Sequence, residues 1–238
     1  AKKKTHPLKT IKTLCRNKYF ILITLAFAVI YTSLGLTGGS RIYYAKYVLG
    51  DEMLNSTMTM FNYIPTILTI MLIPVFTKRF GKIKALFVGF LFYAAGLVLE
   101  IAGPVNLPMI YTGLVLQGIG HAALYSCLFA IVGDVVDYSE WKDGIREEGI
   151  TYSVTSFGQK IGTGLGTAAL GWILAAGHYD GTAAVQSASA IFAIKGLFLY
   201  LPLVITVIVL IIWYLFMGID KIYPTVRKEL DERREKAE

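Results

Sequence analysis

Residues Arg146–Gly177, REEGITYSVTSFGQKIGTGLGTAALGWILAAG, decide the class of fold. From Glu148 onward this stretch is long and apolar enough to cross a membrane as one helix, and its single internal charge is Lys160. At about 1.5 Å per residue, Lys160 lies about 18 Å from the start of the helix, near the middle of a hydrocarbon core about 30 Å thick. A lysine at that depth costs at least about 2.5 kcal/mol unless it faces a partner or water.

The two faces of this predicted helix differ. Gly158, Gly162 and Gly166 repeat every four residues and leave a strip of bare backbone on which a second helix can pack closely. Lys160 lies away from that strip, and polar residues at helical spacing accompany it. These are Tyr152, Ser153, Ser156, Gln159, Thr163 and Thr167. A lipid-facing surface is not polar in this way, so the pattern predicts the wall of a water-filled cavity.

Three interpretations of Lys160 compete. The side chain can reach the membrane surface, which is difficult from mid-membrane. It can form an ion pair that only holds two helices together. It can also line the path of a substrate or ion, because ionisable residues inside membranes usually mark such paths. We favour the third interpretation and keep the structural ion pair as an alternative.

The composition indicates an all-α membrane protein. The chain has 238 residues, of which 55% are hydrophobic and 16% charged, whereas soluble domains carry about 25% charged residues. The net charge of +7 does not indicate a nucleic-acid partner, because the lysines and arginines lie at the ends of long uncharged runs. Cys15 and Cys127 show neither metal-ligand spacing nor a disulfide framework. We expect no metal site.

Long uncharged runs predict a bundle over residues 19–218. A basic linker precedes the bundle at residues 1–18, and a charged tail follows it at residues 219–238 as a surface helix or a disordered segment. Pro65 and Pro74 predict a bend in the second run. The six expected spans are at about residues 19–47, 53–77, 85–102, 108–138, 148–177 and 191–217.

Lysine and arginine also predict the orientation of the bundle. The linker, the tight loop at 78–84, the loop at 138–148 and the tail are basic, whereas the three connections between them contain no lysine or arginine. Cytoplasmic loops carry the excess of these residues. We therefore predict a multi-pass protein of the cell membrane with six spans and both termini in the cytoplasm.

Gln117, His121 and Tyr125 form a polar stripe in the fourth span, because they follow one another at steps of four residues. Two interpretations stay open. The stripe can be a hydrogen-bonded seam between two helices. It can also recognise a hydroxylated ligand, because amide, imidazole and phenol groups all bond to hydroxyls and an aromatic ring can stack on the apolar face of a sugar.

The fourth span ends in acidic residues. Asp134, Asp137 and Glu140 oppose the helix dipole at a C-terminus, so they predict basic partners in the loops nearby. We interpret them, together with Arg146 and Glu148, as a cytoplasmic latch and not as a catalytic pair. Acidic residues at the start of the next helix also simply favour a helix N-terminus, which is the alternative for Glu148.

Enzymatic motifs do not occur in this sequence. It contains no HExxH, GxSxG or Walker loop. His121 lies near Ser126, but no carboxylate accompanies them at that depth as a hydrolase needs. A retinal Schiff base on Lys160 needs a counter-ion nearby. We therefore expect no catalytic residue.

Several motifs resemble those of a known family. GDVVDYSEW at 133–141 and REEGITYSVTSFGQK at 146–160 are similar to the end of helix ten and to helix eleven of the glycoside–pentoside–hexuronide:cation symporters. These are the melibiose-permease-like branch of the major facilitator superfamily. RIYYAKYVLG at 41–50 resembles their helix seven, and RFGKIK at 79–84 resembles a loop generic to the superfamily. The resemblance covers nearly the whole chain and only the C-terminal half of the family's twelve-helix fold.

The resemblance implies roles for single residues. Lys160 matches a helix-eleven lysine close to the cation and sugar sites, and Thr155, Ser156 and Gln159 fall at or beside polar positions near the sugar. Tyr125 stands where melibiose permease has a sugar-contacting tryptophan, and this departure leaves the identity of the sugar open. Charged positions tied to gating are matched by Asp134, Asp137, Arg146 and Glu148.

The resemblance also implies a partner. In the family, the carboxylates that bind the coupling Na⁺, Li⁺ or H⁺ lie in the N-terminal half, and this chain has no acidic residue at the depth of Lys160. We therefore expect a second six-helix half, either an N-terminal half or another copy. The chain begins with a basic linker, as a half cut at the central cytoplasmic loop would. It can be a fragment, one part of a split transporter or a half that assembles with a second copy.

The expected function follows from this partner. The chain supplies part of a midplane glycoside site in a secondary active sugar:cation symporter that works by alternating access. Two alternatives stay open: a non-transporting structural or regulatory membrane module that packs on a partner half, and a transporter of a non-sugar solute such as a lipid.

Overall fold

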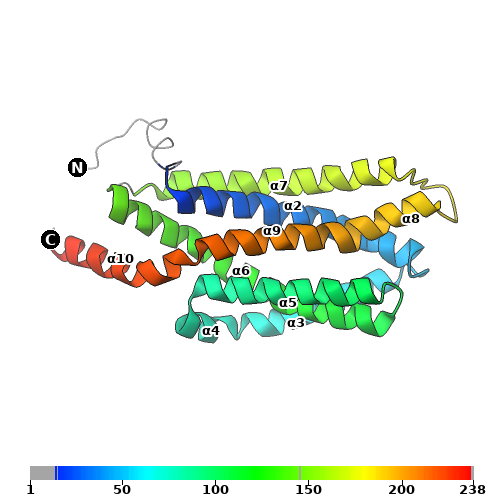
Figure 1. The fold of residues 1–238 in the computed structure, drawn as a ribbon, viewed down its shortest axis with the longest axis horizontal. Coiled ribbons are helices and arrows are strands. Elements are labelled where there is room, and N and C mark those ends of the chain that lie inside the picture. Colours follow the sequence, from blue (N-terminus) through cyan, green and yellow to red (C-terminus); the bar gives the residue numbers. More distant parts are fainter. Residues whose placement is uncertain (1–13, 15, 145, 237–238) are drawn as a thin grey trace.

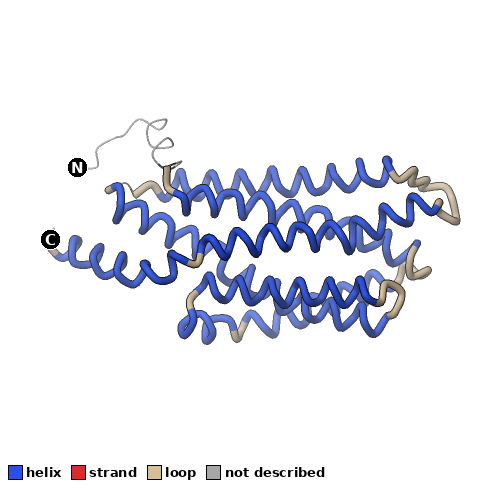
Figure 2. The backbone as a smooth tube through the Cα atoms, viewed as in Figure 1, coloured by secondary structure: helices blue, strands red, loops and turns tan. Residues whose placement is uncertain are grey.

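The computed structural model describes residue 14 and residues 16–144 and 146–236, and all their regular secondary structure is helical (Figures 1 and 2). Most of the predicted basic linker, including Cys15, lies outside the described residues. The helices lie side by side along one long axis. They are α2 (Lys18–Tyr47), α3 (Leu54–Ile70), α4 (Ile73–Phe80), α5 (Lys82–Ala102), α6 (Leu107–Asp143), α7 (Glu148–Ala176), α8 (Ala188–Lys195), the π-helical turn η1 (Gly196–Tyr200), α9 (Leu201–Phe216) and α10 (Gly218–Glu235).

Three helix pairs form the main contacts: α2 with α7, α5 with α6, and α3 with α6. The start of α2 and the end of α10 lie at the same end of the bundle (Figure 1). The turn between α4 and α5 and the connection between α6 and α7 lie toward that end too, and we call it the charged end.

The helices are those of a multi-pass membrane protein. Four segments are long and apolar enough to cross a membrane, namely α2, α5, α6 and the continuous run Ala188–Glu235. The pair α3 and α4, bent by 55°, adds a fifth if it counts as one span. Glu148–Ala176 is not among them, because its many glycine, serine and threonine residues lower its hydropathy. Six spans and cytoplasmic termini therefore stay predictions.

The second predicted span bends, as its prolines indicated. The break falls at Met71 and Leu72, between α3 and α4. Pro74 occupies the first turn of α4, where a missing N–H costs nothing, whereas Pro65 is accommodated inside α3. The prediction of a tight basic loop at 78–84 is wrong, because most of this segment is helical. Here α4 runs to Phe80, α5 begins at Lys82, and Gly81 alone makes the turn with a φ of 92°, which favours glycine.

Two other boundaries differ from the predicted ones. The fourth helix continues to Asp143, because the acidic residues after 133 find partners and do not end it. The last span begins at Ala188 and contains η1. The charged tail is the helix α10 over nearly its whole length, and it buries Val226 and Leu230, which lie one helical turn apart.

The glycine strip of α7 packs on α2 as predicted. Gly158, Gly162 and Gly166 are all buried. A Cβ atom at Gly162 would overlap the carbonyl oxygen of Ala28, and one at Gly166 would overlap that of Thr32. The two backbones are therefore in direct contact, and the opposite face of α7 is left for other uses.

Candidate functional site

An open hollow of about 420 Å³ lies along α7, and Lys160 is part of its wall. It is lined by Tyr152, Ser153, Ser156, Phe157 and Lys160. The Lys160 side chain is exposed, and it has no carboxylate within 4.0 Å among the residues that the structure describes. Within this chain, the structural ion pair that the sequence left open is therefore absent from the described residues.

Two other predicted residues of α7 lie apart from this hollow. Thr155 is fully buried, and its hydroxyl donates to the backbone oxygens of Thr151 and Tyr152. Its place beside the glycine strip comes from helical geometry, since residues three and four apart share a face. Gln159 is half-buried and does not line the hollow.

The polar stripe of α6 runs from the surface into the interior. Tyr125 is 46% exposed. The ring of His121 is half-buried, with its centroid 5.0 Å from that of Tyr93 and 5.9 Å from that of Tyr125. Gln117 is buried, and its Nε2 donates to Oε1 of Glu100 at 2.7 Å. Gln117 therefore forms the interhelical seam, and of the three residues Tyr125 is the one with a largely exposed side chain.

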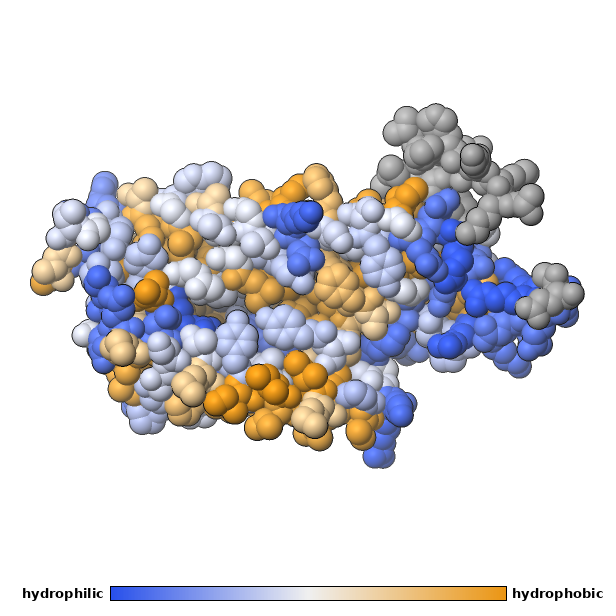
Figure 3. All heavy atoms as spheres, turned by 180° about the vertical axis from the view of Figure 1, so that it is seen from behind, coloured by the Kyte–Doolittle hydropathy of each residue, from blue (hydrophilic) through white to orange (hydrophobic). Residues whose placement is uncertain are grey.

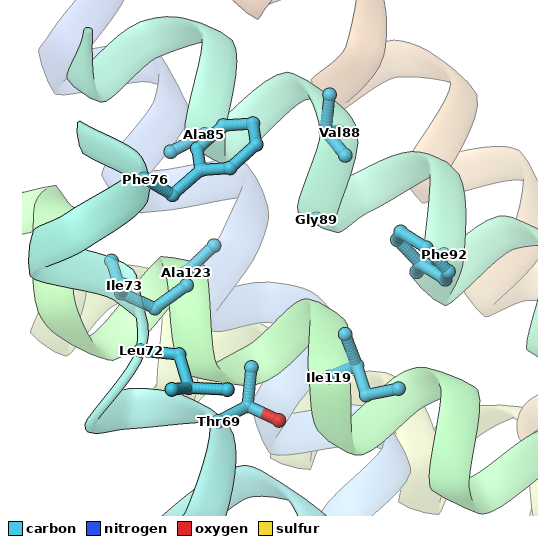
Figure 4. Close-up of a pocket in the computed structure, with 10 residues that line it drawn as sticks. All are labelled: Thr69, Leu72, Ile73, Phe76, Ala85, Val88, Gly89, Phe92, Ile119 and Ala123. Carbon is cyan, nitrogen blue, oxygen red and sulfur yellow. The ribbon is translucent and has the colours of Figure 1, made fainter. Parts of the chain in front are cut away.

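The back face of the molecule is mixed in polarity. Figure 3 shows hydrophilic and near-neutral side chains among hydrophobic ones across much of this face, with a concentrated hydrophobic patch along its lower edge. A separate hollow of about 170 Å³ lies where α3 gives way to α4 (Figure 4). Of the ten residues that line it, Thr69 alone has a polar side chain. This second hollow offers little hydrogen bonding to a polar ligand.

The residues of the predicted latch meet at the charged end, around Arg146. Its Nη1 donates to Asp137 at 2.9 Å and to Glu140 at 2.6 Å, and its Nε donates to Glu148 at 2.9 Å. The hydrogen bond to Glu140, followed by those to Asp137 and Glu148, raises the pKa of Arg146 above its usual value. One guanidinium thus ties the end of α6 to the start of α7, and the predicted basic partner of the acidic residues is confirmed.

Asp134 has its own basic partner. The Nζ of Lys82, at the first residue of α5, lies 2.7 Å from Oδ1 and 2.8 Å from Oδ2 of Asp134. The Asp134 side chain is only 9% exposed. The pair joins α5 to α6 at the charged end, and it gives Asp134 a basic partner, as the sequence predicted for these acidic residues.

The contribution of α10 to the charged end was missed by the sequence analysis. Tyr223 donates to Asp137 at 2.9 Å, Arg234 lies 3.0 Å from Glu140, and the Trp141 indole donates to Glu229 at 2.7 Å. The local signal was the apolar pair at 226 and 230, which marks one face of a helix, but nothing in the sequence indicates where that face docks.

The fold defines a multi-pass membrane protein. The chain belongs to the MFS/sugar transport protein family, whose model matches residues 1–221. The family predicted from the motifs is thereby confirmed. Since the relatives below are transporters, the prediction that the chain is not an enzyme is confirmed as well.

The chain is 31% identical over 237 residues to the isoprimeverose transporter of Lactiplantibacillus pentosus, covering 97% of this chain and 48% of that protein. It is 26% identical to the glucuronide carrier protein homolog of Escherichia coli K12, covering 94% of this chain and 50% of that protein. It is 25% identical to the putative glycoside/cation symporter YagG of the same strain, and the match covers 95% of this chain and 49% of that protein. The chain spans about half the length of these curated relatives.

Proposed function

We propose that this chain is the C-terminal half of a secondary active sugar:cation symporter that works by alternating access. It lies in the cell membrane with both termini in the cytoplasm. A second six-helix half, an N-terminal half or another copy, completes the sugar site and holds the coupling Na⁺, Li⁺ or H⁺. Support comes from the family, from the sugar transport and cation symport in the names of the relatives, and from the match to about half their length.

The hollow at Lys160 carries this proposal. Ser153 and Ser156 offer hydroxyls that donate and accept, and the ammonium of Lys160 offers three donors. The rings of Tyr152 and Phe157 offer apolar faces on which a pyranose can stack. Hydroxyl and ammonium groups beside exposed aromatic rings suit a glycoside, which carries both hydroxyls and apolar ring faces. Because α7 alone lines the hollow, the opposing wall must come from elsewhere.

The charged end serves as the cytoplasmic latch in this proposal. Arg146 bonds across the junction of α6 and α7, and Lys82 bonds α5 to α6. Alternating access needs each half to move largely as one body. These bonds keep the helices of this half together while the half rocks against its partner.

Substitution of Lys160 tests the proposal. In the assembled transporter that contains this chain, Lys160→Ala should abolish uptake of radiolabelled glycosides while membrane insertion and assembly persist, because the side chain is exposed in the hollow. The matched control is Lys195→Ala, a lysine of α8 outside the hollow, which should retain uptake. If Lys160→Ala instead loses assembly and retains transport per assembled molecule, the lysine has a packing role and the chain fits a structural or regulatory module.

A non-sugar solute is the second candidate, and the apolar hollow in Figure 4 favours it. Its lining of aliphatic and aromatic side chains matches an acyl chain better than a sugar. A transfer assay that follows a fluorescent lipid in proteoliposomes separates the candidates. Lipid transfer that survives Lys160→Ala but fails in Val88→Trp, which enlarges a half-buried side chain in the lining of the hollow, favours a lipid. Glycoside uptake that fails only in Lys160→Ala favours the sugar.

A further inference from the structure

A second polar cluster lies inside the bundle, toward the end opposite the charged end. Its centre is Glu100 on α5, which is 0% exposed. One carboxyl oxygen, Oε1, accepts from Gln117 at 2.7 Å. The other oxygen, Oε2, is buried and has no hydrogen-bond partner among the described residues. This carboxyl therefore has one neutral amide as its partner and no cation within 4.0 Å in the described chain.

Two glycines shape the slot that holds this carboxyl. A Cβ at Gly113 on α6 would lie 2.6 Å from Cγ of Glu100, and a Cβ at Gly96 would lie 3.0 Å from Cγ of Gln117. α5 and α6 thus approach at small residues and enclose the acidic side chain. Burying an ionised carboxylate without a cation is very costly, whereas the protonated acid can accept the Gln117 amide on Oε1 without that cost.

Arg41 on α2 is the candidate cationic partner for Glu100. Its Nη1 donates to Thr59 on α3 at 3.2 Å, while its Nε is buried and has no partner in the described chain. It forms no ion pair with Glu100 in this conformation. The guanidinium is therefore only partly satisfied where it stands, and the free oxygen of Glu100 is an alternative acceptor.

We propose that Glu100 is a proton-binding site whose protonation decides whether Arg41 bonds to Thr59 on α3 or to Glu100 on α5. The structure corresponds to the protonated form, in which Glu100 bonds to Gln117 and Arg41 bonds to Thr59. On deprotonation the proton leaves Oε2 for water, and the new carboxylate draws the guanidinium away from α3. The inference concerns this chain alone and does not depend on the proposed glycoside site.

Other ionisable groups face the cluster from the surrounding elements. They interact electrostatically with Arg41, with Glu100 or with each other: Tyr44 on α2, Tyr63 on α3, Tyr93 on α5, His121 and Tyr125 on α6, and Tyr200 in η1. Of these, His121 is the group whose unperturbed imidazole titrates near neutral pH. A His121→Asn variant therefore separates its titration from that of Glu100.

Infrared difference spectroscopy tests the proton site in the full chain in nanodiscs. The carbonyl stretch of a protonated carboxylic acid should be present at neutral pH, be lost on raising the pH, and be absent from Glu100→Gln. His121→Asn and Glu52→Gln, which changes an exposed carboxyl, should keep it. Should Glu100→Gln not fold, Arg41→Gln serves: loss of the nearby cation should shift the disappearance of the band to higher pH. A chain with no such band at any pH, or a band that persists in Glu100→Gln, overturns the proposal.

A distance measurement tests the switch. Spin labels on Met53→Cys and Val105→Cys report the separation of α3 and α5 in a background without Cys15 and Cys127. Both positions are exposed and lie next to the ends of these helices that are away from the charged end. The separation should change across the pH range in which the infrared band is lost, and it should stay at its low-pH value in Glu100→Gln. An equal separation at both ends of that range means that Arg41 does not switch, and this outcome overturns the proposal.

Discussion

Gly162 is the residue of α7 at which the backbone of a neighbouring helix leaves no space. Any Cβ there meets the carbonyl oxygen of Ala28, and a carbonyl of a long helix cannot move aside as a flexible side chain can. We expect Gly162→Ala to lower the free energy of unfolding by about 1–3 kcal/mol, as overpacking of tight interiors does. Thermal unfolding in detergent measures this.

Gly164→Ala is the matched control for that substitution. It lies two residues along the same helix, and a Cβ there meets no atom within 4 Å. Alanine favours helix over glycine by up to about 1 kcal/mol, so this variant should be as stable as the parent chain or more so. Equal stability of the two variants would contradict the packing described for α2 and α7.

Asp220 joins α10 to α5, because its side chain caps the N-terminus of α5. It belongs to α10, yet its Oδ2 accepts from the backbone N–H groups of Ile83 and Lys84 in the first turn of α5, at 3.2 and 3.3 Å. An acidic side chain there satisfies donors that have no partner within the helix. We expect Asp220→Ala to cost about 0.5–2 kcal/mol, with faster hydrogen exchange at residues 83 and 84.

Asp231→Ala is the control for the loss of an acidic residue from α10. Asp231 is exposed and lies 3.7 Å from Arg234 within the same helix. Its removal should leave exchange in α5 unchanged and alter stability by less than about 0.5 kcal/mol. Faster exchange at residues 83 and 84 in both variants would mean that α10 as a whole, and not the carboxylate of Asp220, protects that turn.

Features set by neighbours in the sequence were predictable at the scale of elements. Apolar runs bounded by charges located the helices to within a few residues, the repeat of Gly158, Gly162 and Gly166 identified a packing face, and Pro74 indicated the bend. Each signal acts through the residue's own backbone or its own helix turn.

Contacts between distant positions were not predictable in the same way. Gln117 bonds to Glu100 and Tyr223 bonds to Asp137, and neither pair has a local pattern that marks it. Thr155 shows a finer limit: two adjacent polar residues, Thr155 and Ser156, face different environments, because one helical step of about 100° separates the interior from the hollow.

The contacts of Arg146 matter at the scale of the whole molecule, because they join the end of α6 to the start of α7 at the charged end. Each of its ion pairs is partly exposed, with the Arg146 side chain 37% exposed, so each contributes at most about 1 kcal/mol. We expect Arg146→Ala to speed hydrogen exchange at the ends of α6 and α7 near residues 137–151. Salt at about 1 M should shrink the difference, because it screens exposed charges.

Lys228→Ala is the control for the latch. It removes a cation from α10 whose distance to Glu232 is 4.0 Å and whose side chain is 79% exposed. Exchange at the junction of α6 and α7 should not change in this variant. If Arg146→Ala has no effect at low salt either, the acidic residues of α6 are held by Lys82, Tyr223 and Arg234 alone.

At the scale of the whole molecule, the prediction concerns how many chains form the transporting complex. The hollow at Lys160 opens from one helix, and the chain spans about half the length of its curated relatives. Native mass spectrometry in nanodiscs, with and without candidate glycosides, should therefore find a complex of two six-helix halves that binds a glycoside. A lone chain that binds none would assign the function to a larger protein containing this half.

The contact between α2 and α7 has a mechanical consequence. The main chains of α2 and α7 touch at successive glycines, with almost no side chain between them. Such helices resist sliding and rotation against each other and move as one rigid unit. Lys160 lies on α7, and Arg41 lies on α2. A shift of α7 at Lys160 should therefore move α2, and with it Arg41, through direct backbone contact.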